Sequence, residues 1–176
     1  MDLLNEDGDG HPICYMSVLH MILVDVYEKL RLLGVKPALL YRALLGAARD
    51  QGIISHTEDG DIGFRVTRNK RAVVDQIKQA LWRKATTCST TRYSASSLVL
   101  RSAVPYVDLY EMKREWLGFG ANWRVQHARS GQVADEDLQP YFQMQLLDQE
   151  FDTLVDPRGF LTMEYSADFL TPRPRM

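Results

Sequence analysis

Residues 37–84 read PALLYRALLGAARDQGIISHTEDGDIGFRVTRNKRAVVDQIKQALWRK. Apolar residues at intervals of three and four predict a helix over Pro37–Asp50, with Pro37 in its first turn and Gly52 at its end. The same spacing predicts a second helix over Lys70–Lys84, capped by Asn69. The stretch between these two helices contains the signals of a β-hairpin.

The predicted hairpin begins with a short strand at Ile53–Ser55. Asp59-Gly60 is typical of a tight turn, because glycine and aspartate tolerate the backbone angles that such turns need. From Ile62 to Val66 apolar residues then alternate with others, as in a half-buried strand. The sequence therefore predicts the order helix, hairpin, basic helix.

Residues 37–67 resemble the second half of a winged-helix module in the order of their elements. In that family the helix before the hairpin enters the major groove of DNA. The resemblance implies that Arg42 and Arg49 face DNA, and that Arg65 and Arg68 flank the wing.

The rest of the chain predicts an α+β protein. An apolar stripe indicates a helix from Ile13 to Leu33, ended by Gly34. Beyond it, the predicted elements are a strand at 98–100, a helix at 104–116 and a strand at 122–127. An Asp156–Gly159 turn should join the segments 151–155 and 160–165 as a hairpin. The predicted divisions are a lead-in (1–12), a helical winged-helix-like half (13–84), a Ser/Thr-rich linker (85–97), an α+β half (98–170) and a tail (171–176).

Size and composition favour an ordinary intracellular protein. The chain has 176 residues, 45% of them hydrophobic, and a net charge of −2. That length is enough to bury a sizeable core. No apolar run is long enough for a membrane span, and the acidic N-terminus differs from a secretory leader. With two cysteines the sequence predicts no disulfide framework, which favours a cytoplasmic location.

The sequence motifs predict neither a metal site nor a cofactor. Asn5–Gly10 matches the start of an EF-hand calcium loop, but Met16 stands where that loop needs its bidentate glutamate. His11, Cys14 and His20 lack the close pairing of zinc ligands. The sequence also lacks a phosphate-binding loop, a nucleophile elbow and a dinucleotide-binding glycine pattern.

Charge asymmetry is the feature that favours binding over catalysis. All charged residues in 65–84 except Asp75 are basic, and every charged residue from Asp135 to Asp152 is acidic. The leading hypothesis is a non-catalytic regulatory protein that contacts nucleic acid or an acidic protein surface. The predicted contacts are the basic residues around the hairpin: Arg42, Arg49, Arg65, Arg68, Lys70 and Arg71.

Two other functions fit the same sequence. A self-assembling subunit, such as a viral matrix-like or capsid-associated protein, could form a homo-oligomer through its basic and acidic patches and exposed aromatic residues. A thiol-dependent hydrolase could use Cys88 as its nucleophile and His127 as its base. In the first alternative the protein would oligomerise without nucleic acid, and in the second Cys88→Ala would abolish an activity.

Overall fold

A computed structural model of the protein describes residues 13–55, 57–66, 70–82, 88–89, 98–101, 105–117, 120–129, 133–134 and 141–172. The described helices are α1 (Ile13–Leu32), α2 (Tyr41–Asp50), α3 (Lys70–Trp82) and α5 (Pro157–Tyr165). The described strands are β1 (Pro37–Leu39), β2 (Asp59–Val66), β3 (Cys88–Ser89), β4 (Leu98–Arg101), β5 (Tyr106–Leu117), β6 (Gly120–Val125), β7 (Val133–Ala134), β8 (Phe142–Leu146) and β9 (Gln149–Thr153). The α+β fold class is therefore confirmed.

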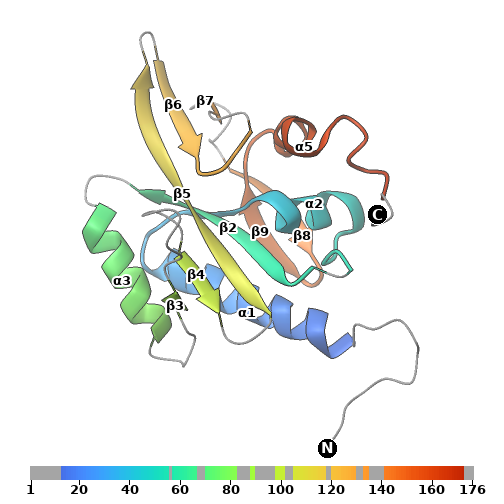
Figure 1. Ribbon diagram of the computed structural model, residues 1–176, viewed down its shortest axis with the longest axis horizontal. Coiled ribbons are helices and arrows are strands. Elements are labelled where there is room, and N and C mark those ends of the chain that lie inside the picture. Colours follow the sequence, from blue (N-terminus) through green and yellow to red (C-terminus); the bar gives the residue numbers. More distant parts are fainter. Residues whose placement is uncertain are drawn as a thin grey trace, which may run out of the picture.

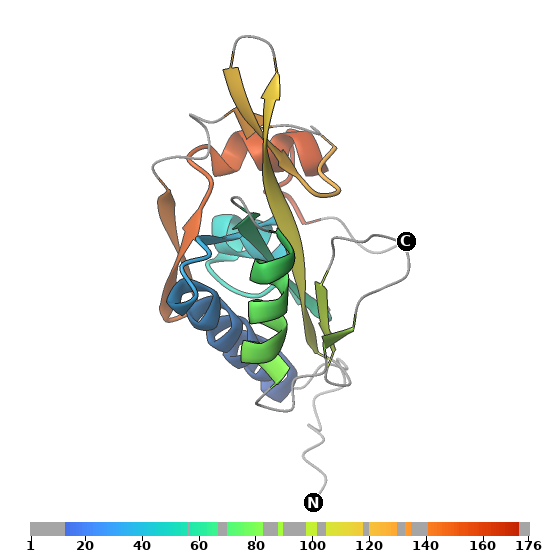
Figure 2. The ribbon, with the colours of Figure 1, turned by 90° about the vertical axis from the view of Figure 1, so that its left-hand side faces the viewer.

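Seven of the described strands form one mixed sheet, and β8 and β9 form a separate hairpin. The large sheet has the order β1-β2-β5-β4-β3, with β6 also paired to β5 and β7 paired to β6. Strands β2 and β5 run parallel, whereas the other pairs are antiparallel. The long strand β5 crosses the molecule, and its end with β6 extends beyond the other elements (Figures 1 and 2).

Helix α1 covers one face of the β2–β5 pair, and α3 packs beside it. Helix α1 approaches β2 closely at Gly60, where an added Cβ atom would lie 2.7 Å from Leu23 Cδ1. Because side chains alternate along a strand, Asp59 and Asp61 leave the sheet on the opposite face. Helix α2 lies against β2 and α5, so it borders the face that carries these two acids.

The expected helices at residues 13–33 and 70–84 are confirmed as α1 and α3, and Gly34 follows α1 with a positive φ of 71°. The expected helix start at Pro37 is wrong. Pro37–Leu39 is strand β1, buried throughout and paired with Phe64–Ile62, so α2 begins only at Tyr41. Burial against β2 has overridden the preference of proline for a first helical turn.

The predicted hairpin around Asp59-Gly60 is also wrong. Both residues lie inside β2, whose partners are β1 and the distant β5. Residues Ile53–Ser55 form no strand. A strand that pairs with segments far along the chain does not need a turn at its Asp-Gly step, and the fold therefore contains no wing at this point.

Two expectations for the second half need correction, whereas the strands expected at 98–100 and 122–127 are confirmed as β4 and β6. Residues 106–117 form strand β5, where a helix was expected. The expected Asp156–Gly159 turn instead begins α5: the Asp156 side chain accepts a hydrogen bond from the Gly159 N–H at 2.9 Å, and Pro157 fills the first turn.

Several predictions lie outside the described residues. These are the lead-in with its acidic loop, most of the Ser/Thr-rich segment 85–97, the acidic run at 135–137 and the last four residues of the tail. Strands from both sides of segment 85–97 share the large sheet.

Among the described helices, none combines the length and apolar character that crossing a bilayer requires.

Candidate active site

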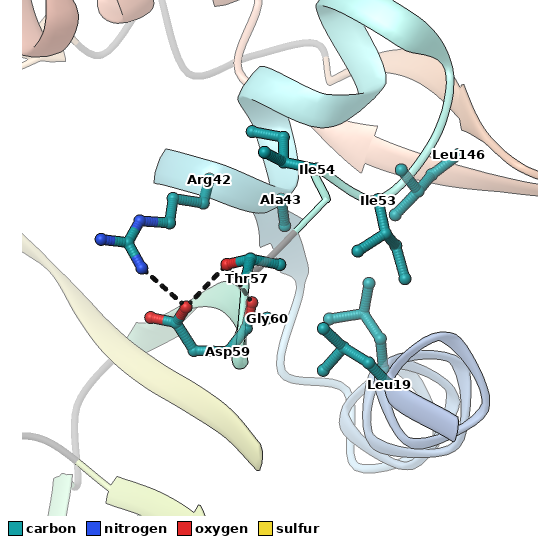
Figure 3. Close-up of a pocket in the computed structure, with 10 residues that line it drawn as sticks. Leu19, Arg42, Ala43, Ile53, Ile54, Thr57, Asp59, Gly60 and Leu146 are labelled. Carbon is teal, nitrogen blue, oxygen red and sulfur yellow. Dashed lines mark hydrogen bonds and ion pairs between the residues drawn. The ribbon is translucent and has the colours of Figure 1, made fainter. Parts of the chain in front are cut away.

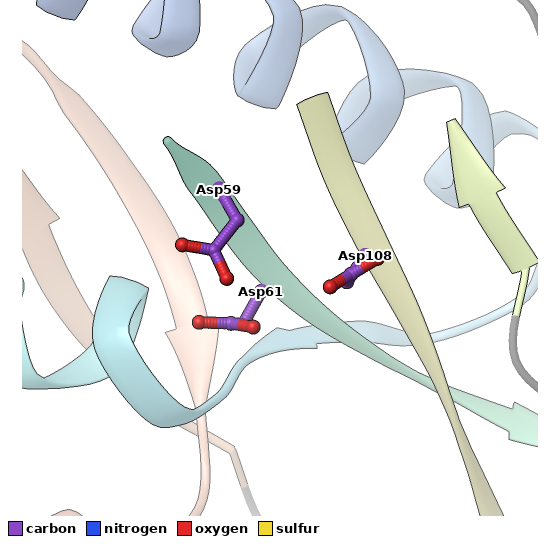
Figure 4. Close-up of side chains that lie close together, drawn as sticks. All are labelled: Asp59, Asp61 and Asp108. Atoms are coloured by element: carbon purple, nitrogen blue, oxygen red, sulfur yellow. The ribbon is translucent and has the colours of Figure 1, made fainter. Parts of the chain in front are cut away.

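Three aspartates bring their carboxylates together on the face of the sheet opposite α1. One carboxylate oxygen from each of Asp59, Asp61 and Asp108 lies within 4.8 Å of the others. Figure 4 shows the first two on β2 and the third on β5, with their carboxylates pointing toward one another. The register explains this placement, because Asp61 is paired with Asp108 and Asp59 is two residues before Asp61.

Asp61 is the most buried member of this carboxylate cluster, which we define as Asp59, Asp61 and Asp108. Its side chain accepts hydrogen bonds from the Arg42 backbone N–H at 2.9 Å and from the Tyr110 hydroxyl. Burial, with the nearby charges of Asp59 and Asp108, raises the pKa of Asp61 from 3.8 to about 7. The hydrogen bonds oppose that rise because they favour the ionised form.

Asp59 is held by two side chains on the same carboxylate oxygen. Its Oδ1 accepts from Thr57 Oγ1 at 2.9 Å and lies 3.0 Å from Arg42 Nη1. Figure 3 shows both interactions beside a small apolar hollow of about 10 Å³ between α1 and the segment after α2. Asp59 therefore joins the carboxylate cluster to the start of α2.

The start of α2 is fixed by an unusual backbone. Tyr41 has a positive φ of 43°, in the left-handed region that a bulky side chain rarely adopts. Its hydroxyl donates to the Gln126 carbonyl, and its ring packs 4.7 Å from Tyr110 and 5.6 Å from Phe160. These contacts hold Tyr41 in its strained backbone conformation, which directs the N–H of the next residue, Arg42, toward Asp61.

An open pocket of about 310 Å³ lies in front of the acids. Its lining residues come from five segments: Tyr41, Arg42, Asp59, Asp61, Tyr110, His127, Glu164 and Tyr165. Helix α5 supplies the last two, and the buried Glu164 accepts a hydrogen bond from the Arg129 N–H at 2.7 Å. That bond attaches α5 to the loop after β6, which carries His127.

The tyrosine hydroxyls of the pocket remain protonated at neutral pH. Burial, followed by the charges of neighbouring acids, raises the pKa of Tyr41, Tyr110 and Tyr165 well above the usual value of 10. A protonated hydroxyl can donate a hydrogen bond to an anionic ligand. The pocket thus combines carboxylates, which can hold cations, with hydroxyl donors.

Among the predicted nucleic-acid contacts, the side chains of Arg42, Arg49 and Arg65 are described, and these three have different surroundings. Arg42 lies at the carboxylate cluster, and Arg49 pairs with the adjacent Asp50. Arg65 is buried, with its guanidinium 4.9 Å from the ring of Trp123 and 4.6 Å from that of Tyr141. Arg68 lies outside the described residues, and only the helical backbone is described for Lys70 and Arg71.

Cys88 and His127 occupy different parts of the fold. Cys88 belongs to β3 at the end of the sheet order, separated from β5 by β4, whereas His127 lines the pocket. The predicted site residues did not include Asp59, Asp61 and Asp108, which form the candidate site. The signal for the first two was an Asp-x-Asp spacing at the start of an alternating run, which places two carboxylates on one face of a strand.

Nine chains of solved structures match this fold, among them a structure of CdnC from E. coli MS115-1 with ATP. The two chains share 12% sequence identity with a TM-score of 0.46. The alignment covers 70% of this chain and 42% of CdnC, so this chain spans less than half of that protein. A search among curated proteins finds no match.

A family model described as the LicD/FKTN/FKRP nucleotidyltransferase domain matches residues 34–153, more than half of the chain. The matched segment contains all three aspartates of the carboxylate cluster. This match overturns the expectation of a non-catalytic regulatory nucleic-acid binder, and with it the alternatives of a viral structural subunit and a thiol-dependent hydrolase. The chain belongs to the LicD/FKTN/FKRP nucleotidyltransferase-domain family.

Proposed function

We propose that the protein is an enzyme that transfers a nucleotidyl group with the help of divalent cations bound by Asp59, Asp61 and Asp108. In such a reaction an acceptor oxygen bonds to the α-phosphorus of a nucleoside triphosphate, and pyrophosphate leaves with the electrons of the broken P–O bond. The observation that carries the proposal is the convergence of three carboxylates within 4.8 Å in a chain of this family.

The residues present fit Mg²⁺ or Mn²⁺. Both ions prefer carboxylate oxygen ligands, and the cluster offers three carboxylates from two adjacent strands. Cations at such a site would neutralise phosphate charge and stabilise the attacking and leaving oxygens. The repulsion among Asp59, Asp61 and Asp108 is an additional reason why a cation would bind here.

The chain's own side chains supply binding and orientation. Asp59 and Asp61 line the open pocket, so a polyphosphate can reach these two acids. The protonated hydroxyl of Tyr165 can donate to an oxygen atom of a ligand, whereas the hydroxyls of Tyr41 and Tyr110 already donate to Gln126 and Asp61. Tyr165 and His127 line the pocket, where their side chains can orient a nucleoside or an acceptor.

Isothermal titration calorimetry with Mn²⁺ tests the cation site directly. We expect saturable binding to the wild-type protein and a loss of at least about tenfold in affinity for Asp61→Asn and for Asp108→Asn, because each substitution removes a charged ligand. The exposed Asp75 of α3 provides the matched control, and Asp75→Asn should bind Mn²⁺ like the wild type.

The enzymatic proposal is tested by incubating the protein with Mn²⁺ and each nucleoside triphosphate, together with a mixture of candidate acceptors, while pyrophosphate release is followed. Release that depends on Asp61 and Asp108 but not on Asp75 supports nucleotidyl transfer. Mn²⁺ affinity that is unchanged in Asp61→Asn and Asp108→Asn would show that the cluster is not a cation site, and the proposal would fail.

A further inference from the structure

We propose that Arg42 is an exchangeable counter-ion: it neutralises Asp59 while the cation site is empty and binds a phosphate group of the substrate once a cation occupies that site. The inference rests on the proposed function. Arg42 would then position a phosphate group, a role that the carboxylate cluster alone does not imply.

Arg42 occupies the position at which it competes with a cation. Among the described residues that line the pocket, Arg42 is the one permanently charged cation. Its Nη1 lies 3.0 Å from Asp59 Oδ1, an oxygen that already accepts from Thr57. A divalent cation bound by Asp59 would repel the guanidinium at this distance. Cation binding and the Arg42–Asp59 contact therefore oppose each other.

The contact is also easy to exchange. It joins a single guanidinium nitrogen to the carboxylate, and 54% of the Arg42 side chain is exposed. Exposed ion pairs add little stability, whereas a divalent cation attracts a carboxylate more strongly than one positive charge does. The Asp59 side chain is only 14% exposed, so its charge needs compensation, and the bound cation supplies this when the guanidinium departs.

The base of the Arg42 side chain stays in place during such an exchange. The Arg42 N–H donates to Asp61 at 2.9 Å, and the preceding Tyr41 is fixed by its ring and hydroxyl contacts. Only rotation of the long side chain is needed, and this takes place at the edge of an open pocket. A guanidinium released there offers two parallel N–H donors, the arrangement that matches a phosphate group.

The test uses Mn²⁺ and inorganic tripolyphosphate as probes, with binding measured by calorimetry. Arg42→Gln should bind Mn²⁺ alone about three- to tenfold more tightly, because a repelling charge is gone. Tripolyphosphate binding in the presence of saturating Mn²⁺ should weaken about tenfold or more, because a charged hydrogen-bond donor is lost. Arg42→Lys should recover part of the tripolyphosphate affinity through its charge, without the bidentate contact.

Arg31→Gln is the matched control. Arg31 Nη1 lies 3.0 Å from Glu28 Oε1, and its side chain is 56% exposed, so the pair resembles Arg42–Asp59 but lies on α1 away from the carboxylate cluster. This variant should leave both affinities unchanged. Thermal unfolding of each variant confirms that the fold is retained.

The remaining outcomes overturn the inference. If Arg42→Gln weakens both affinities, Arg42 merely maintains the shape of the site. If it tightens Mn²⁺ binding without affecting tripolyphosphate, Arg42 is a counter-ion that makes no phosphate contact. Both results leave the proposed function intact. Absence of Mn²⁺ binding to the wild-type protein is a distinct result, which refutes the proposed cation site and the inference that rests on it.

Discussion

Asp61 and Asp108 occupy directly paired positions of the parallel strands β2 and β5. Their side chains leave the sheet on one face, where Asp59 joins them. Like charges at this distance repel, and the burial of Asp61 removes the water that would otherwise screen them. The pairing therefore destabilises the fold locally, at the position where the candidate site needs its carboxylates.

In protein freed of divalent cations, Asp61→Asn should stabilise the fold above pH 7. The pKa of Asp61 is raised from 3.8 to about 7 in the folded state, so the unfolded chain releases this proton at lower pH. The stabilising contribution of the protonated acid is therefore complete below about pH 4 and is lost as pH rises through about 7. The full change corresponds to at most about 4 kcal/mol.

Urea unfolding in EDTA at several pH values between 5 and 8 measures this effect. The stability difference between Asp61→Asn and the wild type should grow with pH, because asparagine cannot ionise. Asp75→Asn, at an exposed position of α3, should show no such growth. Parallel stability profiles for Asp61→Asn and the wild type would contradict the expected protonation of Asp61.

Gly46→Ala should destabilise the protein by roughly 2–4 kcal/mol, because the added methyl group has no space. A Cβ at Gly46 would lie 2.3 Å from the Gly52 carbonyl oxygen, which belongs to the rigid backbone after α2. Gly52→Ala is the matched control: its nearest contact is 3.6 Å, and its stability should change by less than about 0.5 kcal/mol. Denaturant midpoints compare the two, and equal losses would argue against the close approach.

Arg65→Ala should lower the stability of the fold by about 2–4 kcal/mol, because the guanidinium is packed against two aromatic rings and its removal leaves a cavity. Arg124, with a side chain that is 64% exposed, should tolerate alanine with a loss below about 0.5 kcal/mol. Urea unfolding measures both. A loss for Arg65→Ala no greater than that for Arg124→Ala would show that the two ring contacts contribute little.

Local sequence signals identified α1 and α3 but failed for β5 and α5. The apolar stripes of α1 and α3 can be recognised because a helix is defined by neighbours within one turn. Strand β5 was mistaken for a helix because Tyr106, Leu109 and Tyr110 fit helical spacing, while Val107, Leu109 and Glu111 are buried in strand alternation. The pairing that makes β5 a central strand comes from distant segments.

The same reason explains why the candidate site was missed. Asp59-Gly60 is a strong local turn signal, and it was outweighed by the parallel pairing of β2 with β5. The spacing of Asp59 and Asp61 is visible in the sequence. The β2–β5 register that places Asp108 beside them depends on the tertiary structure and cannot be read from the sequence. The charge of Arg42 predicts a phosphate contact, but in the structure its neighbour is Asp59 of the carboxylate cluster.

Tyr110→Phe should weaken cation binding mainly at low pH. The Tyr110 hydroxyl donates to Asp61 and opposes the rise of its pKa. Without this donor the pKa of Asp61 rises beyond about 7, so more of the acid is protonated near neutral pH. Because a cation binds the ionised carboxylate, Mn²⁺ affinity should fall about tenfold at pH 6.5 if the pKa rises by about one unit.

Calorimetric titrations with Mn²⁺ at pH 6.5 and 9 separate this effect from a change in shape. At pH 9 Asp61 is ionised in both proteins, so the affinities of wild type and Tyr110→Phe should agree within about threefold. Tyr165→Phe, which removes another hydroxyl from the same pocket, should show no dependence of its effect on pH. An equal loss at both pH values for Tyr110→Phe would mean that the hydroxyl positions the carboxylate without controlling its protonation.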